Sequence, residues 1–307
     1  MRWQGVSCSM FPFRFVAILL VVLACSGGGA AEVQRGSPIG FGDYITEGLP
    51  PDATNLIEIA ASQVFTLGLR ADGSVIGWGS SYNFGALSIP LDLPKVRQIA
   101  AGYYFGMALT EEGNVRVWGA WGHVFQTAIV TPPVEATNLV AIAGGMAHCF
   151  ALRADGRVFA WGDHLSDALL VPAGLSNATS ITAGQRFSLG ITSAGQIVAW
   201  GNTEYYQQSA KPPGFNAPIA SAISPFGFVL GLNSDGRLYG WGNNSANQLS
   251  FPVRSGITAI AAGSQHGAAI TTAGDLVAWG DNTYLDLKQA RYARSIGSAD
   301  FFRFCTA

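Results

Sequence analysis

Short blocks of apolar residues recur along this chain with a period of about 40 residues. The dipeptide Trp-Gly marks the period, and its six tryptophans are separated by 40, 43, 39, 41 and 38 residues. They are Trp78, Trp118, Trp161, Trp200, Trp241 and Trp279. Five residues before each of them lies a glycine, which follows Asp or Glu in four of the six copies. Self-similarity at this spacing indicates a repeat protein.

Each repeat predicts short antiparallel strands. A small-residue strand such as 99–102 (Ile-Ala-Ala-Gly) is followed by an apolar strand such as 107–110, an Asp-Gly turn and a strand that ends in Trp-Gly. A weaker fourth strand leads to a proline-bearing connection such as 170–172. Asp-Gly between apolar runs is a strong hairpin signal, and four-stranded units without helical periodicity are typical of a β-propeller. We therefore predict an all-β fold in which small first strands line the axis and the six tryptophans are core residues between blades.

The two ends of the chain each contain part of a repeat. Residues 38–42 resemble a Trp-Gly strand with Phe41 in the Trp position, and residues 295–304 resemble the first two strands of a unit. Together they would complete one blade, so we predict seven blades, six of them intact and four-stranded and one split between the termini. We expect residues 39–42 to pair with residues 302–305, which would close the ring and remove an exposed sheet edge.

A ring-bearing residue follows the Ala-Gly end of the first strand by three positions. It is His148 or His266 in two repeats and a phenylalanine in the others, namely Phe65, Phe105, Phe187, Phe228 and Phe302. Together with the Ile-Ala-Ala-Gly runs, the Asp-Gly turns and Trp-Gly, this pattern resembles the regulator of chromosome condensation repeat family. The bacterial β-lactamase inhibitor protein II is similar in its repeat length and its split blade. The resemblance extends over about residues 33–307 and implies a β-propeller.

The resemblance also implies two activities that the residues can test. The inhibitor carries aromatic rings two residues after the Ala-Gly motif in successive blades, where they help to bind its enzyme. The matching residues here are Val64, Tyr104, Ala147, Arg186, Gly227, Gln265 and Phe301. Because only Tyr104 and Phe301 are aromatic, inhibition of a β-lactamase is disfavoured. Guanine-nucleotide exchange, the nuclear function of the family's founder, is disfavoured by short repeats and by a predicted export signal.

That signal lies at the N-terminus. Residues 15–24 are ten uninterrupted apolar residues, preceded by Arg14 and followed by a run of small residues up to Ala31. The run is too short to span a membrane and predicts a signal peptide over residues 1–31, leaving 32–307 as one propeller domain. Cleavage after Ala31 and lipoprotein processing before Cys25 both fit the pattern. We expect an exported protein that is periplasmic, extracellular or lipid-anchored to a bacterial envelope membrane.

Charge and reactive residues argue against several functions. With 17 Lys and Arg against 19 Asp and Glu, the net charge of −2 disfavours nucleic-acid binding, which requires a basic surface. His148 and His266 occupy the structural repeat position, whereas His123 and His164 lie in different repeats without ligands at metal-site spacing. We read Cys149 and Cys305 as small buried residues. These observations predict no metal, no cofactor and no enzymatic activity.

Strand alternation predicts one face rich in aromatic residues. The turn after each first strand and the loop after each Trp-Gly must emerge on the same side of the ring, opposite the Asp-Gly turns. The candidate protein-binding residues on that side are Tyr82, Phe84, Tyr103, Tyr104, Trp121, Phe125, Tyr205, Tyr206, Phe226, Tyr284 and Phe301. Exposed aromatic residues are common anchors of protein interfaces. We expect a non-catalytic, monomeric module that binds an unidentified protein, with a membrane contact only through a lipid on Cys25.

Two alternatives stay open. The chain could inhibit an extracellular enzyme such as a β-lactamase. It could instead be a hydrolase or lyase whose site lies at the mouth of the ring and uses carboxylates such as Asp163 and Asp281.

Overall fold

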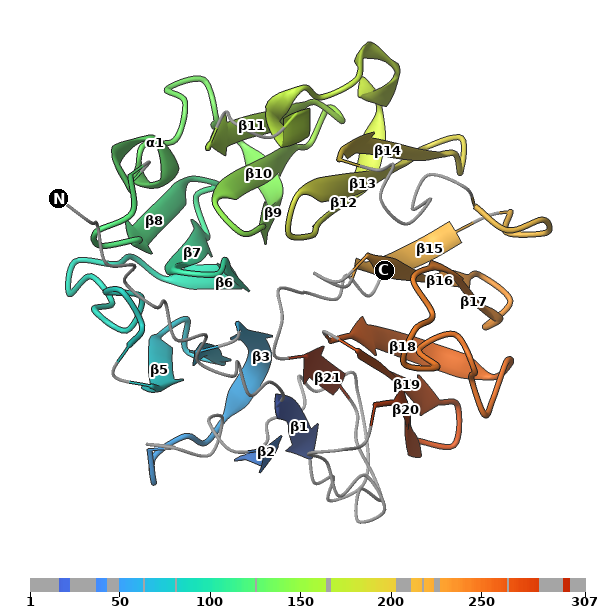
Figure 1. Ribbon diagram of the computed structural model, residues 1–307. Helices are drawn as coiled ribbons and strands as arrows, with labels where there is room; N and C mark the ends of the chain where they lie inside the picture. The colour runs from blue at the N-terminus through green and yellow to red at the C-terminus, as the bar shows by residue number, and fades with distance from the viewer. Residues whose placement is uncertain are drawn as a thin grey trace, which may run out of the picture.

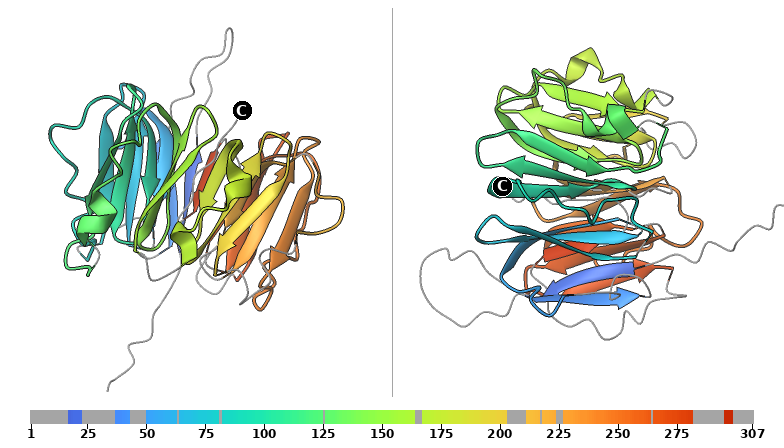
Figure 2. Two further views of the ribbon diagram at one scale, coloured as in Figure 1. Left: turned by 90° about the horizontal axis from the view of Figure 1, so that it is seen from above. Right: turned by 90° about the vertical axis from the view of Figure 1, so that its left-hand side faces the viewer.

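The strands form three-stranded antiparallel sheets placed radially around a central axis (Figure 1). The computed structural model describes residues 17–22, 37–42, 50–62, 64–80, 82–124, 126–163, 167–202, 211–216, 218–223, 227–263, 265–281 and 295–298. Within this part of the chain the secondary structure is almost entirely β. The strands run roughly along the axis, so the loops gather on two opposite faces of the molecule (Figure 2). The predicted all-β propeller architecture is confirmed.

Six of the sheets each use one continuous stretch of chain, and the first strand of each lies nearest the centre (Figure 1). Their strands are β3 (Leu56–Ala61), β4 (Phe65–Arg70) and β5 (Val75–Gly79); β6 (Val96–Ala101), β7 (Phe105–Thr110) and β8 (Val115–Gly119); β9 (Leu139–Gly144), β10 (His148–Arg153) and β11 (Val158–Gly162); β12 (Ala178–Ala183), β13 (Phe187–Thr192) and β14 (Ile197–Gly201); β15 (Pro218–Ile223), β16 (Phe228–Asn233) and β17 (Leu238–Gly242); and β18 (Ile257–Ala262), β19 (His266–Thr271) and β20 (Leu276–Gly280).

The predicted fourth strand is wrong for the described sheets, which have three strands each. After Trp-Gly the chain instead forms turns and short helices, namely α1 (Gln126–Val130), η1 (Asp167–Leu169) and η2 (Ala173–Leu175). Prolines such as Pro90, Pro133 and Pro172 occur in these segments. A proline has no N–H to donate to a ladder, so such segments cover the outer strand with side chains instead of pairing with it.

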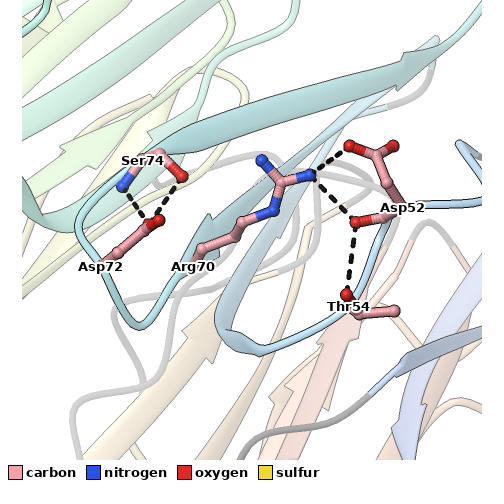
Figure 3. Close-up of polar contacts among 5 residues, drawn as sticks. All are labelled: Asp52, Thr54, Arg70, Asp72 and Ser74. Carbon is pink, nitrogen blue, oxygen red and sulfur yellow. Dashed lines mark hydrogen bonds and ion pairs between the residues drawn. The ribbon is translucent and has the colours of Figure 1, made fainter.

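The Asp-Gly hairpin prediction is confirmed in detail (Figure 3). In the turn between β4 and β5, Gly73 has φ +84° and its N–H donates to the Arg70 carbonyl at 3.0 Å. The Asp72 carboxylate accepts the N–H of Ser74 at 2.9 Å, which closes the turn from the other side. Positive φ is readily available only to glycine, and this explains its place in every repeat.

The six tryptophans are buried, with exposed fractions of 1 to 7%. Several indole N–H groups donate to a backbone carbonyl of the preceding repeat: Trp118 to Ala86, Trp161 to Ile129, Trp200 to Ala168 and Trp279 to Gln248, at 2.7 to 2.9 Å. Each of these tryptophans therefore fills the space between two sheets and also joins them by a hydrogen bond.

Main-chain bonds join neighbouring sheets at the opposite face. The carbonyl of the turn glycine accepts an N–H from the first strand of the next sheet, at 2.9 to 3.0 Å. The pairs are Gly73 with Val96, Gly113 with Leu139, Gly156 with Ala178 and Gly236 with Ile257. Neighbouring sheets are thus joined by indole hydrogen bonds near one face and by main-chain hydrogen bonds near the other.

One further sheet combines both ends of the chain, in the order β2 (Ser37–Gly42), β1 (Ala17–Val22) and β21 (Ser295–Ser298). β21 contacts β18 on one side and β3 on the other. A sheet built from both termini was predicted, but the expected pairing was different: β1 lies beside β2, with Leu20 opposite Ile39. Residues 302–305, which we expected there, lie outside the described part of the chain.

Candidate protein-binding face

Trp-Gly brings two loops together at one face of the ring. Gly119 has φ +95°, and the N–H of the following Ala120 donates to the Tyr104 carbonyl at 2.7 Å. A Cβ on Gly119 would lie 2.8 Å from that same oxygen. The loop after β8 is thereby held against the turn after β6, as strand alternation predicts. The corresponding bonds recur from Ser80 to Val64 and from Asp163 to Ala147, both at 2.8 Å.

Aromatic rings from two neighbouring sheets meet on this face. The Tyr104 ring, in the turn after β6, lies 4.3 Å from Phe84 in the loop after β5 and 4.2 Å from Tyr103, both edge to face. His123, in the loop after β8, lies 6.0 Å away on another side. We call Tyr82, Phe84, Tyr103, Tyr104 and Trp121 the aromatic cluster. Pairs of this geometry are stabilising beyond the area that they bury.

Trp121 extends the aromatic cluster towards solvent. Its N–H donates to the Phe84 carbonyl at 2.8 Å, and its ring lies so close to Gly85 that a Cβ there would be 2.4 Å from the indole. The side chains of Tyr82, Phe84 and Trp121 are nevertheless 79, 43 and 55% exposed. Exposed aromatic side chains beside packed rings are typical anchors for a partner.

The backbone of Phe84 is held in an unfavourable conformation. Its φ is +53°, in the left-handed region that bulky residues rarely adopt. Asn83 imposes this shape, because its side-chain oxygen accepts the N–H groups of Gly85 and Leu87 at 3.1 and 3.2 Å while its Nδ2 donates to the Ser80 carbonyl at 2.9 Å. Strain of this kind, of order 1 to 3 kcal/mol, concentrates at functional sites.

Several predicted face residues cannot be placed. Phe125, Tyr205, Tyr206, Phe226, Tyr284, Phe301 and the lipidation candidate Cys25 lie outside the described part of the chain, as does His164. The prediction missed His123, which joins the rings at Tyr104, and Val124 beside it, which is 86% exposed. Both follow Trp121 in the same loop. Their position in that loop could have placed them on the face, whereas a search for aromatic residues alone could not.

Charged pairs occupy the face with the Asp-Gly turns. Arg70 binds Asp52, Arg116 binds Asp92 and Arg153 binds Asp155, each at 2.6 Å (the first pair in Figure 3). The hydrogen bond from Arg153 lowers the pKa of Asp155 to about 2. The two faces therefore differ in chemistry: the Asp-Gly face carries these ion pairs, and the opposite face carries the aromatic cluster.

The two repeat histidines lie in the interior, where each is 1% exposed. The nearest ring atom of His148 lies 2.3 Å from where a Cβ on Gly145 would be, and that of His266 lies 2.1 Å from the same point on Gly263. Phe105 covers Gly102 in the same way, also at 2.1 Å. A buried ring over a glycine explains the three-residue spacing and agrees with a structural role.

Among the described residues, no group of three His, Cys, Asp or Glu side chains could hold a metal ion. Within the same residues, no helix combines the length and apolar character needed to cross a membrane.

Comparison with known proteins identifies the repeats. The regulator of chromosome condensation (RCC1) repeat matches residues 96–123, 226–248 and 257–284. These three segments carry the repeat that the Trp-Gly pattern resembles.

Relatives and solved structures agree with this assignment. The chain is 28% identical over 173 residues to protein pim1 of Schizosaccharomyces pombe and 28% identical over 179 residues to a secretion-regulating guanine nucleotide exchange factor of mouse. These matches cover 47 and 48% of the chain but only 32 and 38% of the relatives, so the chain spans about a third of their length. The structure of Prp20p from Saccharomyces cerevisiae matches with a TM-score of 0.68 at 19% identity, over 93% of this chain and 86% of that one.

These relatives contradict the prediction that the chain is not an enzyme. They include guanine nucleotide exchange factors and the human E3 ubiquitin-protein ligase HERC2, which is 26% identical over 175 residues covering 45% of this chain and 4% of that protein. Both names denote catalysts. The prediction failed because it looked for converging nucleophiles, acids and metal ligands, whereas exchange of a bound nucleotide breaks no covalent bond and needs none of them.

Proposed function

We propose that this propeller binds another protein through the aromatic cluster. The observation that carries the proposal is the strained Phe84, which Asn83 holds so that its ring packs edge to face on Tyr104 while 43% of the residue stays exposed. Protein binding also suits the repeat class: the Prp20p structure is described together with binding of that protein to Gsp1p and histones. From the net charge of −2 we predict that the chain does not bind nucleic acid.

Cross-linking from the face tests this proposal directly. A photoreactive phenylalanine analogue at position 82, where Tyr82 is 79% exposed, should capture a partner from the compartment in which the chain resides. Leu91 is equally apolar and fully exposed, and it precedes Asp92 of the ion-paired face, so the same analogue there is the matched control. Capture from position 91 and not from position 82 would mean that we have assigned the wrong face.

Once a partner is purified, affinity measures the individual rings. Trp121→Ala and Tyr104→Ala should each weaken binding by roughly 1 to 4 kcal/mol if they lie near the interface centre. Asp235→Ala, in an exposed turn of the opposite face, should leave affinity within about 0.5 kcal/mol of wild type. Circular dichroism spectra identical to wild type would show that the cluster variants are folded. Equal affinity for all variants would refute the proposal.

We also propose that the chain is exported and that its ring is closed by both termini as a seventh blade. The apolar run at residues 15–24 supports export. The order β2-β1-β21 supports closure, and because β1 lies within that run, this sheet forms only if the run is retained. After cleavage, closure needs β2 to pair directly with the C-terminal segment. Determining the mature N-terminus by mass spectrometry distinguishes cleavage after Ala31, lipidation of Cys25 and retention of residues 17–22. An inhibitor of an extracellular enzyme is one form that this binding could take, and a captured hydrolase with reduced turnover would identify it.

A further inference from the structure

His148 lies directly beneath the face that carries the aromatic cluster. It begins β10, and its ring packs over Gly145, the first residue of the β9–β10 turn at that face. Its Nε2 is buried without a hydrogen-bond partner among the described residues, and its ring contacts Phe150 at 5.2 Å. The equivalent residues of other repeats, Phe105 and Phe187, are also buried, so packing at this position does not need the nitrogens.

A short chain of contacts links this turn to the aromatic cluster. The Gly145 carbonyl accepts the N–H of Tyr103 from the neighbouring sheet at 3.2 Å. The Tyr103 ring in turn lies 4.2 Å from the Tyr104 ring, the centre of the cluster. Movement of the turn at 145–147 would therefore remove a backbone anchor of Tyr103.

We propose that acid opens the 145–147 turn through protonation of His148 and thereby loosens the aromatic cluster, making the binding face sensitive to pH. An imidazolium ion is not stable in an apolar pocket without a partner, so the ring must leave its place over Gly145 to reach water. The inference rests on the proposed function only in assigning a purpose to the change. The opening itself is a property of the free protein.

The surroundings of His148 determine the direction in which its pKa is shifted. Burial lowers the pKa of His148 to about 4 from a usual value of 6.5. Charged groups on the elements packed around it are Asp163, after β11, and Arg186, in the turn after β12; Cys149 follows it on β10, and burial raises the pKa of that thiol well above its usual value. Asp163 is anchored to the same turn through its N–H bond to Ala147 at 2.8 Å.

Hydrogen exchange on the full chain tests the inference without a partner. If the open form has an ordinary histidine and the closed form has the lowered pKa, the equilibrium constant for opening should rise roughly 25- to 30-fold between pH 7.5 and pH 5. After correction for intrinsic rates, the Tyr103 amide should lose protection by about that factor in wild type. In His148→Phe, which copies the residue of neighbouring repeats, protection should change little. His266→Phe, in a distant sheet, should behave at Tyr103 as wild type does.

A second measurement protects the test against a variant that fails to fold. The imidazole carbon shifts of wild-type His148 should titrate with a midpoint well below the usual 6.5, and Tyr103 protection should fall over the pH range between the two values. Equal loss in wild type and His148→Phe, or titration of His148 without exchange at Tyr103, would overturn the inference. Neither result would touch the binding proposal, which depends on affinity measured at neutral pH. Conversely, a face that binds nothing would still show the opening.

Discussion

Single glycines show how local geometry shapes the binding face. Gly119 and Gly122 both have positive φ, +95° and +76°, and they lie on either side of Ala120 and Trp121. A Cβ on Gly119 would meet the Tyr104 carbonyl at 2.8 Å, whereas a Cβ on Gly122 would have nothing within 4 Å. Substituting alanine at each of these two glycines therefore separates the effect of backbone strain from that of crowding.

Gly122→Ala should destabilise the protein by about 1 kcal/mol, the cost of a left-handed alanine. Gly119→Ala carries that strain and a contact with backbone that cannot move away, so about 3 kcal/mol or more is expected. Denaturant unfolding of the two variants measures the difference. Equal losses would indicate that the Trp-Gly glycine is needed only for its φ.

How far residues could be predicted depended on whether they repeat. The Asp-Gly turns, the buried tryptophans and the ring after the Ala-Gly end followed from six aligned copies, because similar residues recur at the same positions. The left-handed Phe84 did not, since it depends on the side-chain hydrogen bonds of Asn83, which the repeat pattern does not show. Asn247, also six residues after a repeat tryptophan, is left-handed as well, with φ +59°. The fourth strand was mispredicted because apolar content suggests a strand but prolines decide whether it can pair.

At the scale of elements, the outer strands connect sheets through their tryptophans. Trp161, on β11, fills the gap to the preceding sheet and donates its indole N–H to the Ile129 carbonyl of α1 at 2.9 Å. This hydrogen bond therefore couples β11 to α1, although the two elements belong to neighbouring repeats.

Trp161→Ala should lower the free energy of unfolding by about 3 to 5 kcal/mol, as deletion of a large buried aromatic does. Trp161→Phe keeps much of the side-chain volume but leaves the Ile129 carbonyl without its donor. It should lower the free energy of unfolding by about 1 to 3 kcal/mol. The exposed Trp121→Phe is the control and should stay within about 0.5 kcal/mol. A loss below about 1 kcal/mol for Trp161→Ala in a denaturant titration would contradict the core assignment.

The whole molecule should become less stable in mild acid. Burial lowers the pKa of both His148 and His266 to about 4, although Asp281 acts in the opposite direction on His266. The unfolded chain thus binds more protons, and stability is present above pH 6.5 and is lost as pH falls towards 4. Each histidine accounts for about 2 kcal/mol at pH 5.

Unfolding of wild type and the double variant His148→Phe with His266→Phe, at pH 7.5 and pH 5, measures this loss. The variant should lose about 4 kcal/mol less than wild type between the two pH values. Carboxylates such as Asp155, with a pKa of about 2, titrate in both proteins and cancel in the comparison. Parallel losses would show that the buried histidines do not govern acid sensitivity.

The bonds from Gly73, Gly113, Gly156 and Gly236 to the next sheet use only backbone atoms, a carbonyl on one side and an N–H on the other. A unit joined in this way presents the same acceptor to the unit after it and the same donor to the unit before it, provided that its first strand does not begin with a proline, as it does at Pro218. Removing one unit, or inserting a copy, leaves compatible ends on its two neighbours. The ring is in this sense modular: its loops can be exchanged between blades to build a new binding surface while the joints between blades stay the same.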